Sequence, residues 1–173
     1  MELKGSRVIA ADRATVWAAL NDADVLRQCI PGCTELTGSP ADGFEAKVTQ
    51  KVGPVKANFA GAVALSDVVE GESYTITGEG KGGAAGFAKG GAAVSLADVE
   101  GGTELSYDVE AKVGGKLAQL GSRLIDGFAK KMADQFFERF QNVVEGGSDG
   151  EGDEDAGGQE PEKKKGWFKS IVG

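Results

Sequence analysis

The stretch KLAQLGSRLIDGFAKKMADQFFERFQNVV, residues 116–144, carries apolar side chains at steps of three and four. That spacing places them on one face of an α-helix. A helix over the whole stretch is about 43 Å long at about 1.5 Å per residue, well above the globular average. A helix of this length must lie across a whole sheet to bury its apolar stripe. The stripe consists of Leu117, Leu120, Leu124, Phe128, Met132, Phe136 and Phe140.

The residues before this helix alternate between apolar and polar, which is the period of a β-strand with one solvated face. In GFEAKVTQKV, residues 43–52, the side chains of Phe44, Ala46 and Val48 share one face. Similar segments follow, and turn sequences such as Gly101-Gly102 separate them. The pattern predicts an antiparallel meander of strands.

The N-terminal part predicts one strand and two short helices. A strand over residues 3–10 precedes Asp12, which stands at the N-cap position of the helical segment RATVWAALND. The segment DADVLRQC predicts a second helix that stops at Pro31-Gly32. A strand, two short helices, a series of strands and a long helix are typical of the helix-grip fold. In this α+β fold, a curved antiparallel sheet wraps around the C-terminal helix.

Small side chains occupy many inward positions of the predicted strands. On a curved sheet they leave a volume that can take an apolar ligand. Alternatively, glycine supplies the curvature and the phenylalanines of the helix fill the gap. Both interpretations are open at this point. The small inward residues are Ala46, Ala57, Gly61, Gly78, Gly80, Ala92 and Ala111.

If the volume holds a ligand, its contacts come from the strands and the long helix. Tyr74 and Tyr107 could donate a hydrogen bond to a ligand carbonyl, and Arg123 could reach a polar head group. Gly121 and Gly127, which the pattern places inside the helix, indicate that a strand or a ligand approaches the backbone there. The candidate ligand-binding residues are Phe44, Phe59, Tyr74, Tyr107, Leu120, Arg123, Leu124, Phe128 and Met132.

The composition excludes several kinds of chemistry. The chain has no histidine, which rules out Ser-His-Asp and Cys-His nucleophiles and histidine-ligated zinc. We predict no catalytic residue and no metal site, and we expect Cys29 and Cys33 to be structural thiols beside Pro31-Gly32. A formal net charge of -8 disfavours a nucleic-acid partner. Because we find neither a signal sequence nor a spanning segment, we expect a cytoplasmic protein.

Three blocks of the sequence resemble one protein family. They are LNDADVLRQCIPGCTEL at residues 20–36, KVGPVKANFAGAVAL at 51–65 and KVGGKLAQLGSRLIDGFAKKMADQFFERF at 112–140. Together they resemble the G-subunit family of carbon monoxide dehydrogenase, a branch of the START-like helix-grip superfamily. The resemblance covers residues 1–144. It implies an accessory protein that recruits a molybdenum hydroxylase, such as aerobic carbon monoxide dehydrogenase, to the membrane. It also implies a deep apolar cavity, for which respiratory quinone is the expected ligand.

The C-terminal tail divides into two parts of opposite charge. Residues 145–162 hold eight acidic residues and no basic one, so we expect a disordered linker. Residues 163–173, KKKGWFKSIVG, combine lysines with an apolar helical face, which predicts a weak, reversible anchor on the inner face of the cell membrane. Docking of this segment onto a partner protein, or onto the acidic linker, is the alternative. The expected membrane contacts are Lys163, Lys164, Lys165, Trp167, Phe168, Lys169, Ile171 and Val172.

These observations leave three hypotheses for function. The first is a non-enzymatic carrier that holds a quinone, either menaquinone or ubiquinone, without a covalent cofactor and tethers a molybdenum hydroxylase to an anionic membrane surface. The second is a pure membrane-recruitment adaptor without a ligand. The third and weakest is an enzyme like the cyclases of the superfamily, which the lack of histidine disfavours. A solidly filled interior would exclude the first hypothesis.

Overall fold

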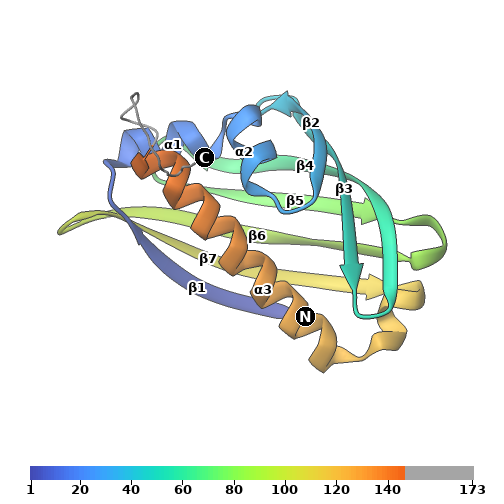
Figure 1. Ribbon diagram of the computed structural model, residues 1–173. Coiled ribbons are helices and arrows are strands. Elements are labelled where there is room, and N and C mark those ends of the chain that lie inside the picture. Colours follow the sequence, from blue (N-terminus) through green and yellow to red (C-terminus); the bar gives the residue numbers. More distant parts are fainter. Residues whose placement is uncertain (147–173) are drawn as a thin grey trace, which may run out of the picture.

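Seven antiparallel strands form one curved, open sheet within residues 1–146, the part of the chain that the computed structural model describes (Figure 1). The strand order is β1-β7-β6-β5-β4-β3-β2, so β1 and β2 are the two edges. All neighbours are consecutive in sequence except β1 and β7, as expected for a meander. The strands are β1 (Glu2–Ile9), β2 (Cys33–Ser39), β3 (Gly43–Val52), β4 (Val55–Val69), β5 (Ser73–Lys81), β6 (Phe87–Val99) and β7 (Gly102–Gly114).

Two short helices follow β1, and one long helix lies across the sheet (Figure 1). The carboxylate of Asp12 accepts a hydrogen bond from the backbone N–H of Thr15 at 2.8 Å, which confirms its predicted capping role. Asp22 caps the second helix through the N–H of Asp24, also at 2.8 Å. The α-helices are α1 (Arg13–Leu20), α2 (Ala23–Cys29) and α3 (Ser122–Gln141). The predicted α+β helix-grip arrangement is confirmed.

The long helix is shorter than the sequence predicts. Residues 116–144 do not form one helix, because a 3-10 segment (Gly115–Leu120) and Gly121 precede α3. Gly121 has a φ of 89°, a left-handed conformation that favours glycine and interrupts the helical hydrogen bonds. A π-helical turn (Asn142–Gly146) follows α3 at its other end. With 20 residues, α3 is about 30 Å long.

Within residues 1–146, no strand packs closely against the two glycines near the start of the helix, Gly121 and Gly127. Gly121 is the N-cap residue of α3, so the helix begins at Ser122. Gly127 lies inside α3, but a Cβ atom added there would meet no atom within 4 Å among the described residues. Of the two approaches that the sequence allows at Gly127, that of a strand is therefore wrong, whereas that of a ligand stays a prediction.

Two hydrophobic clusters attach the helices to the inner face of the sheet, which is the face towards α3. The first cluster lies where α1 packs and includes the fully buried Val16, Leu105 and Phe140. The second lies at the start of α3 and includes Leu117 and Ile125. The 3-10 segment thus keeps Leu117 in the core although α3 begins later.

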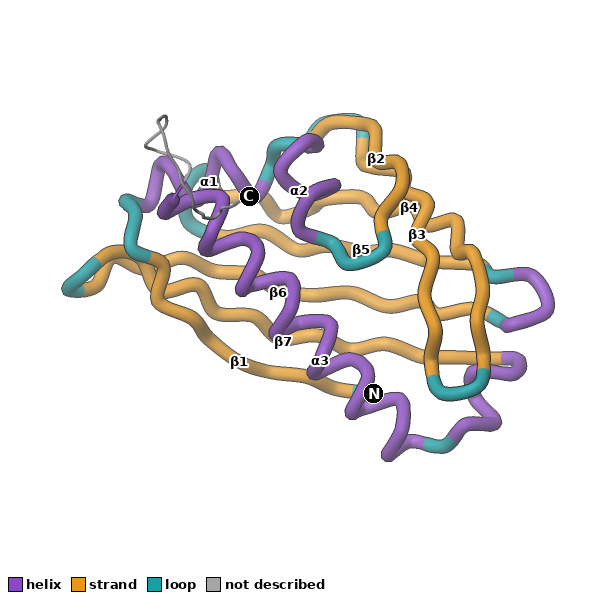
Figure 2. The backbone as a smooth tube through the Cα atoms, in the orientation of Figure 1, coloured by secondary structure: helices purple, strands orange, loops and turns teal. Residues whose placement is uncertain are grey.

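The loop after α2 lies over the sheet, between α3 and β3 (Figure 2). The backbone N–H of Thr49 donates a hydrogen bond to the Gly32 carbonyl at 2.9 Å, and the Gln50 side-chain amide donates to the Pro31 carbonyl. Gly32 has a φ of 77°, and a Cβ atom there would lie 2.1 Å from the Thr49 carbonyl oxygen. Only glycine fits this position, so the Pro31-Gly32 pair, which follows the end of α2 as predicted, also shapes the loop.

Candidate ligand-binding site

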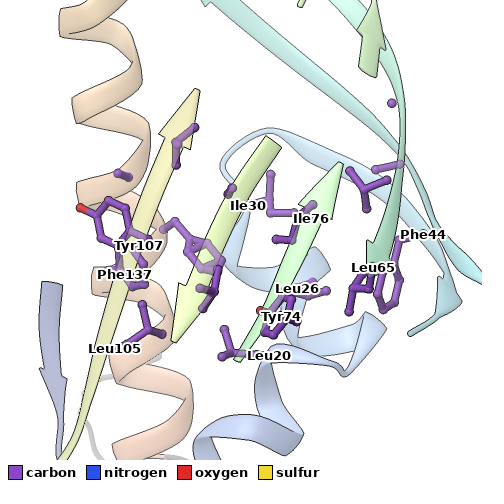
Figure 3. A pocket seen from close by; sticks show the side chains of 18 of the residues that line it. Leu20, Leu26, Ile30, Phe44, Leu65, Tyr74, Ile76, Leu105, Tyr107 and Phe137 are labelled. Atoms are coloured by element: carbon purple, nitrogen blue, oxygen red, sulfur yellow. The ribbon is translucent and has the colours of Figure 1, made fainter. Parts of the chain in front are cut away.

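A cavity of about 360 Å³ lies between the inner face of the sheet and the second half of α3 (Figure 3). We call it the first chamber. All seven strands contribute to its floor, and Phe136 and Phe137 of α3 cover it. Leu20 of α1, Leu26 of α2 and Ile30 of the following loop close one side. The two short helices and the Pro31-Gly32 loop therefore serve as a wall of the chamber.

A second cavity of about 380 Å³ lies beneath the first half of α3. We call it the second chamber. Phe128 and Met132 of α3 cover it, and Leu117 lines its edge. Leu3 and Val109, which are paired across β1 and β7, line both chambers. The two chambers therefore lie next to each other beneath α3, on either side of this pair, and we call the two together the hollow.

Small side chains make room for both chambers. The predicted small inward residues that line a chamber are Ala46, Gly61, Gly80, Ala92 and Ala111. Ala57 and Gly78 line neither chamber. On α3, Ala129 and Ala133 alternate with the aromatic rings and face the second and first chamber respectively. The rings of α3 consequently do not fill the space, and the hollow interior that the sequence left open is present.

Six of the nine predicted ligand-binding residues line the hollow. Leu120 is half-buried and packs against the second hydrophobic cluster instead. Arg123 is exposed, and Leu124 is 38% exposed and lies against the turn at Gly53. These three line neither chamber, because α3 begins only at Ser122 and its first turn projects past the hollow. Those that line a chamber are Phe44, Tyr74 and Tyr107 in the first, and Phe59, Phe128 and Met132 in the second.

Sequence reasoning missed the wall residues Leu20, Leu26 and Ile30. Their helical spacing in α1 and α2 indicates an apolar face, but the sequence does not say which part of the sheet that face covers. In one of the two interpretations left open by the sequence, the phenylalanines of the helix fill the gap. Phe136 and Phe137 instead meet edge to face, with 5.1 Å between ring centroids, and line the first chamber without filling it.

Tyr74 is the most deeply buried polar side chain of the first chamber. It is 5% exposed, and its ring meets Trp17 edge to face with 5.4 Å between centroids. Burial raises the pKa of Tyr74 to about 12, because the apolar surroundings disfavour the phenolate. The hydroxyl therefore stays protonated and available as a donor at neutral pH.

The other chamber tyrosine, Tyr107, belongs to a stack of side chains at the seam between β1 and α3. Its ring stacks on Phe137 with 5.1 Å between centroids. The guanidinium of Arg7 lies 5.3 Å from the centroid of the same Phe137 ring and forms an ion pair with Asp134 of α3. Among the described residues, no charged side chain lines either chamber.

The two thiols lie where their sequence context predicts. Cys29 is fully buried, and burial raises its pKa to about 11. Cys33 is half-buried, and burial also raises its pKa. Both are therefore protonated at neutral pH and poor nucleophiles. Over residues 1–146, no three Cys, Asp or Glu side chains gather as a metal site would require.

The family to which this architecture belongs follows from a comparison of sequences. The profile of CoxG, the G subunit of carbon monoxide dehydrogenase, matches residues 5–145, nearly the whole described chain. The chain belongs to the CoxG family. The resemblance carried by the three sequence blocks is thereby confirmed. No curated protein matches this sequence.

Solved structures share the fold of this CoxG-family protein. A conserved protein from Geobacillus kaustophilus is 28% identical, with a TM-score of 0.79, and the match covers 85% of this chain and 97% of that one. A protein from Chromobacterium violaceum is 19% identical with a TM-score of 0.62, covering 83% and 97%. A protein from Thermus thermophilus is 12% identical with a TM-score of 0.64, covering 86% and 100%. The last two show the fold alone.

The structure does not describe the predicted membrane anchor. Within residues 1–146, no helix is both long enough and apolar enough to cross a bilayer. The predicted anchor, residues 163–173, and all but the first two residues of the predicted linker lie outside the described part of the chain. The roles expected for Lys163, Trp167 and their neighbours stay predictions.

Proposed function

We propose that this CoxG-family protein is a non-enzymatic carrier that holds a respiratory quinone, menaquinone or ubiquinone, in the hollow beneath α3. The single observation that carries the proposal is the hollow itself, two adjacent chambers of about 360 and 380 Å³ with apolar walls. Ligand pockets for small molecules fall in the range of about 300–1,000 Å³. Occupied together, the two adjacent chambers suit a molecule with a ring at one end and an apolar chain at the other.

We further propose that the carrier links a molybdenum hydroxylase of the carbon monoxide dehydrogenase type to the membrane. Family membership supports an accessory role beside such an enzyme. A quinone carrier would explain that role, because electrons from the hydroxylase must reach the quinone pool dissolved in the bilayer. The absence of histidine from the chain and of charged side chains from the described chamber walls disfavours a cyclase-like enzyme.

The carrier proposal predicts that full-length protein purified from its cells contains quinone. Solvent extraction followed by mass spectrometry should recover menaquinone or ubiquinone, and emptied protein should bind added menaquinone-4 at one molecule per chain. Quenching of Trp17 fluorescence reports this binding, because its ring touches Tyr74 at the chamber wall. A protein that holds no quinone and does not bind menaquinone-4, yet still binds the dehydrogenase, contradicts the carrier and supports the pure adaptor.

The membrane link predicts that residues 163–173 attach the protein to anionic lipid. Each lysine near an anionic leaflet contributes about 1 kcal/mol, and burial of Trp167 and Phe168 adds to this. Full-length protein should sediment with phosphatidylglycerol vesicles, less so at high salt, and deletion of 163–173 should abolish sedimentation. Vesicles of pure phosphatidylcholine are the control. Sedimentation of the truncated protein at the full-length level would refute the anchor.

A further inference from the structure

The hydroxyl of Tyr74 has no hydrogen-bond partner among residues 1–146, although the side chain is 5% exposed and lines the first chamber. Figure 3 shows its oxygen among the side chains of the chamber, beside Leu20 and Leu26. Buried polar groups in folded proteins are almost always paired, and leaving one unpaired is unfavourable. We therefore expect the Tyr74 hydroxyl to form a hydrogen bond with a partner inside the chamber.

A single water molecule is a poor partner for this hydroxyl. Buried waters in proteins typically make about three hydrogen bonds. The side chains of the first chamber offer only the hydroxyls of Tyr74 and Tyr107, because every other lining side chain is apolar. A water bound to Tyr74 would have its remaining hydrogen-bonding capacity facing hydrocarbon. A ligand that offers one acceptor oxygen to Tyr74 and is otherwise apolar matches the site better than a water molecule does.

The two chamber tyrosines differ in position. Tyr107 is half-buried, and a Cβ atom at Gly5 of β1 would lie 2.4 Å from its hydroxyl oxygen, so this hydroxyl reaches over the edge strand. In Figure 3 its oxygen points away from the other labelled side chains. Solvent at the edge can therefore pair with Tyr107, whereas Tyr74 is enclosed. The difference singles out Tyr74 as the donor to a ligand.

The walls of the hollow also restrict the charge of the ligand. Burying a carboxylate or phosphate without a cationic partner is strongly unfavourable, and the described walls offer no Lys or Arg side chain. The terminal ammonium of Met1, beside the second chamber, donates a hydrogen bond to the Ala111 carbonyl at 3.0 Å, and the first chamber has no cationic group among its described residues. In the second chamber, the side-chain amide nitrogen of Gln50 already donates to the Pro31 carbonyl. The second chamber thus suits a hydrocarbon chain, and the first suits a neutral head.

We propose that Tyr74 is the specificity-determining residue of the site. Its hydroxyl donates a hydrogen bond to a neutral acceptor oxygen, such as a ring carbonyl, of a lipid whose head lies in the first chamber. The chain of that lipid passes the Leu3–Val109 pair into the second chamber. The site therefore selects neutral carbonyl lipids over fatty-acid anions and phospholipids. This inference rests on the proposed carrier function and adds to it the orientation and chemical class of the ligand.

The test compares Tyr74→Phe with Tyr107→Phe in the full chain. Tyr74→Phe keeps the ring that packs on Trp17 and removes only the hydroxyl. We expect it to weaken menaquinone-4 binding about threefold to tenfold, the size of one hydrogen bond, and by more than Tyr107→Phe does, because the Tyr107 hydroxyl reaches over the edge strand. Palmitate at about pH 8, where it is ionised, should bind the wild-type protein more than about tenfold more weakly than menaquinone-4 does.

A spectroscopic measurement on the wild-type protein makes the test independent of any folding defect. One carbonyl stretching band of bound menaquinone-4 should lie at lower frequency than in hydrocarbon solvent. In Tyr74→Phe, the frequency of this band should return to the value in hydrocarbon solvent. An unshifted band, unchanged affinity in Tyr74→Phe, or palmitate binding as tight as that of menaquinone-4 would overturn this inference while leaving the carrier intact. If wild-type protein binds no menaquinone-4 at all, the proposed function fails as well.

Discussion

Replacing Ala92 by phenylalanine is expected to abolish quinone binding while the protein stays folded. Ala92 lies on β6, opposite Ile76 and Val109 on the neighbouring strands, and its side chain faces the first chamber. A phenyl ring at this position projects into the space where the head of the ligand would lie. We expect the affinity for menaquinone-4 to fall more than about tenfold, because the ring and the head compete for one volume.

The neighbouring residue provides the matched control. Ala93 is exposed and its side chain points to the opposite face of the same strand. Ala93→Phe adds the same ring outside the hollow and should leave binding unchanged. The urea concentration at the unfolding midpoint of Ala92→Phe should equal or exceed that of the wild-type protein, because the ring fills an existing void. Equal binding by Ala92→Phe and Ala93→Phe would show that quinone does not enter the first chamber.

Replacing Phe140 by alanine is expected to lower the free energy of unfolding by about 3–5 kcal/mol. Phe140 is fully buried in the first hydrophobic cluster and stacks on Phe136 with 5.8 Å between ring centroids. Its loss leaves a cavity where the end of α3 joins the sheet and α1. Domains are commonly stable by about 5–15 kcal/mol, so this one change removes a large share.

Urea unfolding followed by circular dichroism measures the effect of Phe140→Ala. Glu138→Ala, an exposed position on the same helix, is the control and should change stability by less than about 0.5 kcal/mol. A loss below about 1 kcal/mol in Phe140→Ala would mean that the end of α3 contributes little to folding. The cover of the first chamber would then be held by other contacts.

The sequence predicts the fold well because each local pattern agrees with the global arrangement. The two-residue period of the strands, the cap at Asp12 and the stop at Pro31-Gly32 all have their expected structural counterparts. The start of the long helix was missed, because glycine is tolerated inside helices and only its backbone conformation shows that Gly121 ends one segment and precedes another. That error also assigned Arg123 and Leu124 to the hollow.

The candidate site is harder to predict because it depends on distances between segments far apart in sequence. Tyr74 and Tyr107 look equivalent in the sequence, as inward residues of strands. They differ because β5 lies in the middle of the sheet, whereas β7 lies next to the edge strand β1. The wall formed by Leu26 and Ile30 likewise requires knowledge of where the loop after α2 crosses the sheet.

The open sheet has a consequence for how the proposed ligand would enter and leave the hollow. β1 and β2 do not pair with each other, so the curved wall has a gap that α3 spans. On the β1 side the helix is fastened by the Arg7–Asp134 ion pair and the Phe137 contact, and on the other side Leu124 rests against the turn at Gly53. Lifting α3 breaks side-chain contacts but no strand ladder. The proposed ligand could therefore enter and leave by displacement of α3, with every backbone hydrogen bond of the sheet intact.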